Sequence, residues 1–142
     1  MAWISLAIFA CFQVNHNLVP PVGGSTCEAR SVADSHGELI AFARMDGAPI
    51  SSIRIAANKA WTAARERKPT KEIGEKVRHP EKGHDIAYYG DPKFVGWGGG
   101  IPVWKNGEVV GPVAVSGLSS NEDISLASLG AELIAGHGGD HP

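Results

Sequence analysis

The most constraining feature of this chain is the dipeptide Asn106-Gly107, which stands between two apolar runs. Both residue types tolerate positive φ, so the dipeptide strongly favours a two-residue turn between antiparallel strands. We therefore predict a hairpin made of strands at residues 101–104 and 108–116. Pro112 in the second run indicates a sheet edge or a bulge, because proline has no N–H to donate to a neighbouring strand.

Three further strands are predicted upstream of this hairpin. Residues 27–34 alternate in polarity with the period of a strand, and residues 39–44 resume after a tight turn. The short stretch at residues 94–97 is also expected to be a strand. Hairpin-connected strands flanked by helices predict an α+β fold with an antiparallel sheet of about five strands.

The longest helix is predicted at residues 50–67, where apolar residues recur at the spacing of one helix face. Ser51 or Ser52 can cap its first turn, since a serine hydroxyl accepts from free backbone amides. Most of the apolar positions are alanines. We therefore expect this helix to approach its neighbour closely.

A second helix is predicted to close the domain, capped by Ser120 or Asn121. Glu122 and Asp123 suit the positive end of its dipole. The glycine-rich residues 136–142 after it are expected to form a flexible tail.

The length of 142 residues favours a single domain, and the net charge of −2 gives no basic field for nucleic acid. The apolar run at residues 2–12 is too short to cross a bilayer as a helix. We interpret it as a buried first helix or an irregular start in a cytoplasmic protein. The alternative is the core of a signal peptide, which would make the protein secreted.

Residues 32–64 read VADSHGELIAFARMDGAPISSIRIAANKAWTAA, and residues 88–117 read YYGDPKFVGWGGGIPVWKNGEVVGPVAVSG. Both stretches resemble the GlcG/HbpS family of haem-binding and haem-degrading proteins, and also the C-terminal domain of PduO-type proteins. The resemblance implies a profilin-like fold, homo-oligomers and, for some members, haem breakdown or redox sensing. Residues 1–31 depart from the family pattern, which opens with an amphipathic helix and an apolar strand.

The triple glycine Gly98, Gly99 and Gly100 is the first candidate ligand site. A ligand could approach its backbone directly because no side chains intervene, or the glycines could serve a tight corner between strands. Tyr89 and Trp97 are near this loop in the sequence. Either aromatic ring could stack on a flat ligand, or pack in the core or at a subunit contact.

Two basic residues are candidates for holding a carboxylate. Lys59 lies in the alanine-rich helix and belongs to the motif of the resembled family. It could bind a ligand or another subunit, or be a surface lysine whose stem covers apolar neighbours. Arg44 stands at the end of a predicted strand and could bind a carboxylate or pair with Asp46.

The polar residues 70–90, expected to be irregular with one helical turn at most, contain His79 and His84. Either imidazole could contact a haem iron, although their spacing does not match the HExxH pattern of zinc sites. No catalytic triad is indicated. Ser116, for example, lacks the Gly-x-Ser-x-Gly context of a nucleophile elbow.

Two functions follow as hypotheses. The first is a haem-binding protein, with haem as cofactor, that degrades or senses haem. The second is an accessory module of a glycolate- or diol-utilisation operon, which binds small hydroxyacids through Lys59, Arg44 and backbone amides without catalysis of its own. Homo-oligomers are expected under both, and whether the protein is an enzyme stays open.

Overall fold

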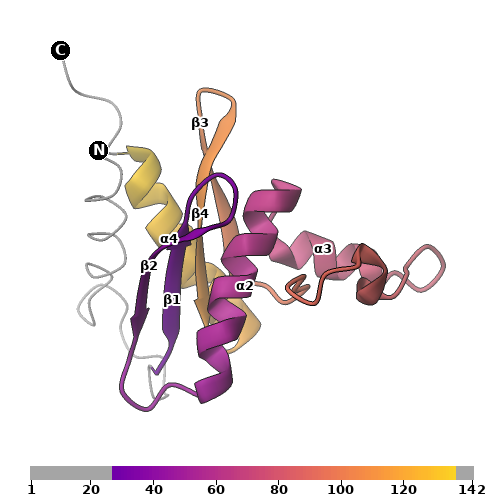
Figure 1. Cartoon of the computed structure of the whole chain (residues 1–142), viewed down its shortest axis with the longest axis horizontal. Helices are drawn as coiled ribbons and strands as arrows, with labels where there is room; N and C mark the ends of the chain where they lie inside the picture. Colours follow the sequence, from indigo (N-terminus) through magenta and orange to yellow (C-terminus); the bar gives the residue numbers. More distant parts are fainter. Residues whose placement is uncertain (1–26, 137–142) are drawn as a thin grey trace.

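The computed structural model describes residues 27–136, which form one antiparallel sheet with helices packed on it (Figure 1). The elements are β1 (Ala29–Ala33), β2 (Leu39–Arg44), α2 (Ile50–Glu66), α3 (Thr70–Val77), the 3-10 helix η1 (Ile86–Tyr89), β3 (Gly100–Lys105), β4 (Glu108–Ser116) and α4 (Ser120–Gly136). The predicted α+β architecture is confirmed. The segment predicted at residues 2–12 and nearly all of the tail predicted at 136–142 lie outside the described residues.

The sheet has four strands in the order β2-β1-β4-β3, close to the predicted five. The strand predicted at residues 94–97 is wrong, because this segment is irregular. Its backbone groups form hydrogen bonds with side chains instead of with a neighbouring strand. The Val95 amide donates to Thr62 Oγ1 at 3.1 Å, and the Gly96 carbonyl accepts from the Arg78 guanidinium at 3.3 Å. Hydrogen bonds from side chains of α2 and of the residue after α3 thus replace those that a neighbouring strand would form.

The predicted hairpin joins β3 to β4, with φ of 50° at Asn106 and 79° at Gly107. Pro112 of β4 lies opposite Pro102 of β3. Strand β1 pairs with β4 only as far as Val113, so the part of β4 that contains Pro112 is paired on one side alone. The proline therefore stands where β4 behaves as an edge.

Helix α2 covers one face of the sheet at close range. The Ser31 hydroxyl of β1 donates to the Ala56 carbonyl of α2 at 2.7 Å. Ala33, Ala60 and Ala114 form a buried cluster between β1, α2 and β4. Small side chains on both sides permit this approach, as the alanine-rich helix predicted.

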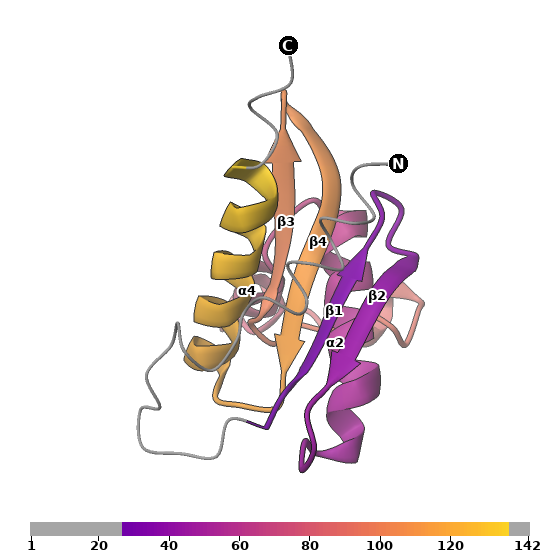
Figure 2. The same ribbon diagram turned by 90° about the vertical axis from the view of Figure 1, so that its left-hand side faces the viewer.

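Helix α4 packs on the opposite face, over β3 and β4 (Figure 2). Its residues Ala131 and Ile134 join a buried apolar cluster with three valines of the sheet, Val32, Val103 and Val113. Burial of these side chains is the main favourable contribution to the free energy of folding on this face.

Both predicted helix caps differ from the structure. Pro49 occupies the N-cap of α2, and no side chain caps this helix, because Ser51 and Ser52 already lie inside its first turn. The cap of α4 is Ser119, which precedes both predicted candidates, Ser120 and Asn121. Its hydroxyl accepts from the Glu122 amide at 3.4 Å while the Glu122 carboxylate accepts from the Ser119 amide at 3.1 Å. This reciprocal arrangement is a capping box.

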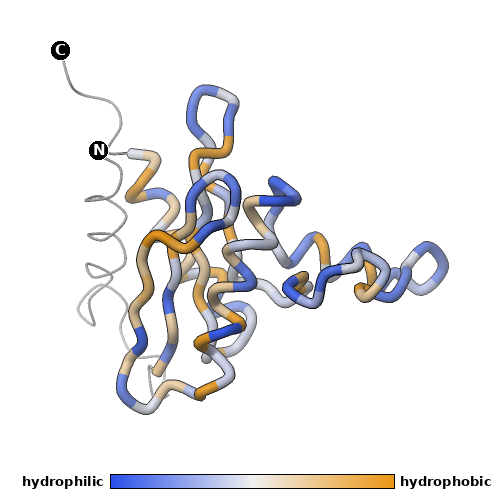
Figure 3. Tube along the Cα trace, viewed as in Figure 1, coloured by the Kyte–Doolittle hydropathy of each residue, from blue (hydrophilic) through white to orange (hydrophobic). Residues whose placement is uncertain are grey.

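Residues 70–93 project from the sheet beyond α2 (Figure 1) and are mostly hydrophilic (Figure 3). The single helical turn predicted here is an eight-residue helix, α3. Among residues 27–136, no helix has the length and hydropathy that a bilayer-spanning segment needs.

Replacing a buried isoleucine should test the packing of α4. Ile134 is 6% exposed and Ile50 is 81% exposed. We expect Ile134→Ala to lower the free energy of unfolding by about 2–5 kcal/mol and Ile50→Ala to change it by less than about 0.5 kcal/mol. Urea denaturation measures both values, and equal effects would contradict the packing described here.

Candidate functional site

Lys59 extends from α2 into the protein interior, where its side chain is 2% exposed. Its ammonium donates to Asp123 Oδ2 at 2.8 Å and to the Val115 carbonyl at 2.9 Å. Asp123, in the first turn of α4, also accepts from the Leu118 amide through Oδ1 at 3.2 Å. The ion pair therefore ties α2 to the end of β4 and to the start of α4. Lys59 is not a surface lysine.

Burial acts against the charge of both partners. It lowers the pKa of the Lys59 ammonium and raises the pKa of the Asp123 carboxyl, while the hydrogen bond and the attraction between the two opposite charges counteract both shifts. Neither charge is well solvated by water at this depth. Each partner consequently depends on the other, and loss of one leaves an uncompensated buried charge.

Of the three glycines, Gly99 packs directly on this ion pair, while Gly98 and Gly100 pack on the residues around it. A Cβ atom at Gly99, where φ is +117°, would lie 2.6 Å from the Val115 carbonyl oxygen and 3.0 Å from Lys59 Nζ. A Cβ at Gly100 would meet the Lys59 carbonyl oxygen at 2.6 Å, and one at Gly98 would meet the Ile124 side chain at 2.5 Å. All three residues are buried. The space that their side chains would fill is thus taken by α2, β4 and α4.

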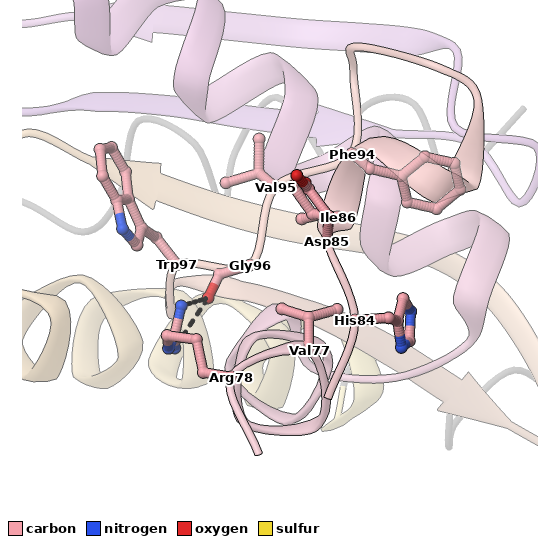
Figure 4. Close-up of a pocket in the computed structure, with 9 residues that line it drawn as sticks. All are labelled: Val77, Arg78, His84, Asp85, Ile86, Phe94, Val95, Gly96 and Trp97. Carbon is pink, nitrogen blue, oxygen red and sulfur yellow. Dashed lines mark hydrogen bonds between the residues drawn. The ribbon is translucent and has the colours of Figure 1, made fainter. Parts of the chain in front are cut away.

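A groove of about 470 Å³ lies between the end of α3 and the segment of residues 84–97. Its walls are mainly apolar, and Figure 4 shows Trp97 and Arg78 toward one end and His84 and Phe94 toward the other. The residues that line it are Val77, Arg78, His84, Asp85, Ile86, Phe94, Val95, Gly96 and Trp97. Two candidates from the sequence, His84 and Trp97, therefore share one concave surface.

Aromatic contacts hold the histidine end of this groove. The half-buried His84 ring lies 5.6 Å from the Tyr89 ring, which stacks on Phe94 at 4.3 Å between centroids. Phe94 in turn meets Trp61 of α2 edge-on at 5.2 Å. Tyr89 thus supports the groove from behind, and the row of rings links His84 to the buried face of α2.

His79 has a different environment from His84. It is exposed, and its Nδ1 accepts from the backbone amides of Glu81 and Lys82 at 3.2 and 3.1 Å. Within the described part of the chain, no three His, Cys, Asp or Glu side chains are grouped so that they could hold a metal ion. The groove itself offers a single imidazole, that of His84.

The structure leaves Arg44 apart from the other candidates. It is exposed at the end of the edge strand β2 and does not line the groove. The sequence prediction missed Arg78 as a groove residue and Asp123 as the partner of Lys59. Asp123 is separated from Lys59 by 64 positions, and no local pattern could pair them.

Comparisons of this chain with family models and with known proteins agree on one family. The family model described as "Haem degrading protein HbpS-like" matches residues 28–132. An uncharacterised 15.0 kDa protein of the dhaT-dhaS intergenic region of Citrobacter freundii is 38% identical over 97 residues, which cover 68% of each chain. The corrinoid adenosyltransferase PduO of Salmonella typhimurium is 31% identical over 97 residues, but these cover only 29% of that protein.

Solved structures share the fold. The Klebsiella pneumoniae protein ORFY superposes with a TM-score of 0.77 and 27% identity, over 94% of this chain and 89% of that chain. A PduOC:haem complex superposes with a TM-score of 0.72 and 24% identity, over 93% of this chain and 89% of that chain. The second likeness concerns the fold alone.

Removing one charge of the buried pair should be far more damaging than removing one charge of a surface pair. We expect Asp123→Asn to lower the free energy of unfolding by about 3–5 kcal/mol, because it leaves the Lys59 ammonium buried without a counter-charge. The control is Glu75→Gln in the exposed pair that Lys71 and Glu75 form at 3.8 Å. That change should cost less than about 0.5 kcal/mol.

The double variant Lys59→Met with Asp123→Leu completes this test. It removes both charges together, and we expect it to recover most of the stability that Asp123→Asn loses. Urea denaturation of the four proteins compares the values. A loss in Asp123→Asn no larger than that in Glu75→Gln would contradict a buried, interdependent pair.

Proposed function

The chain belongs to the HbpS-like family, and from that membership we propose that it binds haem in the groove between α3 and residues 84–97. The observation that carries the proposal is the half-buried imidazole of His84 in the wall of an apolar groove. The haem complex of PduOC, which has the same fold, supports it further.

The residues of the groove fit the chemistry of haem. A porphyrin needs apolar walls, which Val77, Val95 and Trp97 provide. A neutral imidazole is a common protein ligand of haem iron, and His84 would fill that role. The propionates of haem need a cation, and Arg78 would meet one of them. The volume of the groove lies within the range of ligand pockets in proteins, about 300–1,000 Å³.

The protein residues have distinct tasks in this proposal. The stacked rings of Tyr89 and Phe94 limit the movement of His84, so the imidazole is positioned before the ligand arrives. The exposed Trp97 would cover one edge of the ligand. A bound haem would supply redox-active iron. Haem degradation and homo-oligomerisation stay predictions of the family resemblance.

Hemin titration of two histidine variants should test the role of His84. We expect the Soret band to shift on binding to the native protein, and His84→Ala to weaken binding by at least about tenfold. The control His79→Ala changes an exposed histidine five positions away and should bind like the native protein. Equal binding by all three proteins would exclude His84 as the ligand, and no Soret shift at micromolar hemin would exclude haem binding.

Arg78 should discriminate between hemin and its dimethyl ester, which lacks the propionate charges. We expect Arg78→Gln to weaken hemin binding about three- to tenfold and to leave binding of the ester unchanged. Competition titrations followed at the Soret band measure both affinities. An equal loss for both ligands would show that Arg78 acts only by holding the Gly96 carbonyl.

A further inference from the structure

A second cavity, of about 340 Å³, lies between the first turn of α2, the end of β4 and the start of α4. Trp97 lines both this cavity and the groove described above. Apart from that indole, its wall combines the apolar residues Pro49, Ile55 and Leu118 with polar ones, among them Ser52, Lys59, Ser116, Ser120 and Asp123. Such a lining suits a small polar molecule rather than a porphyrin.

Two buried serines of this wall have hydroxyl groups without an internal partner. Ser52 is 2% exposed and Ser116 is 5% exposed. Neither hydroxyl forms a hydrogen bond with any residue in the range 27–136. Ser31, by contrast, is fully buried outside the cavity, and its hydroxyl donates to the Ala56 carbonyl. Among the described residues, the side-chain polar atoms that are closed off and lack a partner are Glu28 Oε2 and Trp61 Nε1, so the two serine hydroxyls can be reached from the cavity. They are therefore available to donate to a molecule that occupies it.

The cavity also has a positive side. The Lys59 ammonium has three N–H donors, and two of them are used by Asp123 and Val115. The first turn of α2 contains no acidic residue and no side-chain cap, so the positive end of its dipole is not neutralised. At α4 the situation is reversed, since Glu122 and Asp123 already satisfy amides there. An anion is therefore favoured toward α2.

We propose that this cavity binds a small organic carboxylate. The hydroxyls of Ser52 and Ser116 donate to its oxygen atoms, and Lys59 with the first turn of α2 provides the positive potential. The volume corresponds to roughly ten water molecules, which suits an acid of a few carbons. Asp123 also lines the cavity, so a ligand with one negative charge is preferred over a phosphate dianion. The site includes Lys59 but not Arg44.

Isothermal titration calorimetry with acetate, glycolate and L-lactate tests the proposal, with inorganic phosphate and chloride as comparison anions at equal ionic strength. We expect at least one carboxylate to bind and to raise the melting temperature, and phosphate to bind at least about tenfold more weakly. No heat and no thermal shift with any carboxylate would overturn the proposal. Phosphate binding as tight as the best carboxylate would overturn the assigned ligand class.

Serine variants then test the location of the site, because cavity serines should affect carboxylate affinity and a serine outside the cavity should affect stability. Ser52→Ala and Ser116→Ala should each weaken carboxylate binding about tenfold while leaving the melting temperature of the free protein unchanged, because no internal hydrogen bond is lost. Ser31→Ala should lower that melting temperature and leave carboxylate affinity unchanged. Native affinity in both cavity variants would overturn the location.

His84→Ala separates this site from the haem groove. Carboxylate affinity should be native in that variant, since His84 does not line the cavity. A loss of carboxylate binding in His84→Ala would overturn the independence of the two sites. A failure of haem binding with carboxylate binding retained would contradict the proposed haem function and leave the carboxylate site standing.

Discussion

The buried ion pair between Lys59 and Asp123 is the interaction on which the rest of this structure depends. It joins helices from opposite faces of the sheet, through an ammonium that also binds the end of β4. The loop of Gly98, Gly99 and Gly100 closes over it with no room for side chains. Because the interior solvates neither charge well, the helices and the loop must hold this geometry together.

This arrangement separates the groove from the cavity, although Trp97 lines both. The groove on the α3 side has apolar walls and one imidazole, and the cavity between α2 and α4 has unpaired hydroxyls and a positive side. The two linings suit different kinds of ligand, since apolar walls favour a flat hydrophobic molecule and free hydrogen-bond donors favour an anion. Membership of the HbpS-like family is the reason to propose haem for the groove. The carboxylate proposed for the cavity rests on the residues of this chain alone.

Local patterns were sufficient wherever neighbouring residues decide the structure. The Asn106-Gly107 turn, the strands beside it and the alanine-rich helix α2 all depend on backbone preference or on periodicity within a few residues. The predictions failed where a distant side chain supplied the partner. Residues 94–97 have strand-like composition, yet Thr62 and Arg78 take their backbone hydrogen bonds. Ser52 resembled a helix cap, yet Pro49 occupies that position.

The sequence by itself determined the α+β class, the hairpin, the helices α2 and α4 and the resemblance to a family. It also indicated Lys59 and the glycine loop, although it could not say that the two are in contact. Only the tertiary structure paired Lys59 with Asp123, separated the groove residue His84 from the turn residue His79, and left Ser52 and Ser116 facing a common cavity. The physical reason is range: turns and helices are set by residues within one or two turns of chain, whereas burial and charge pairing are set by whichever segments the fold brings together.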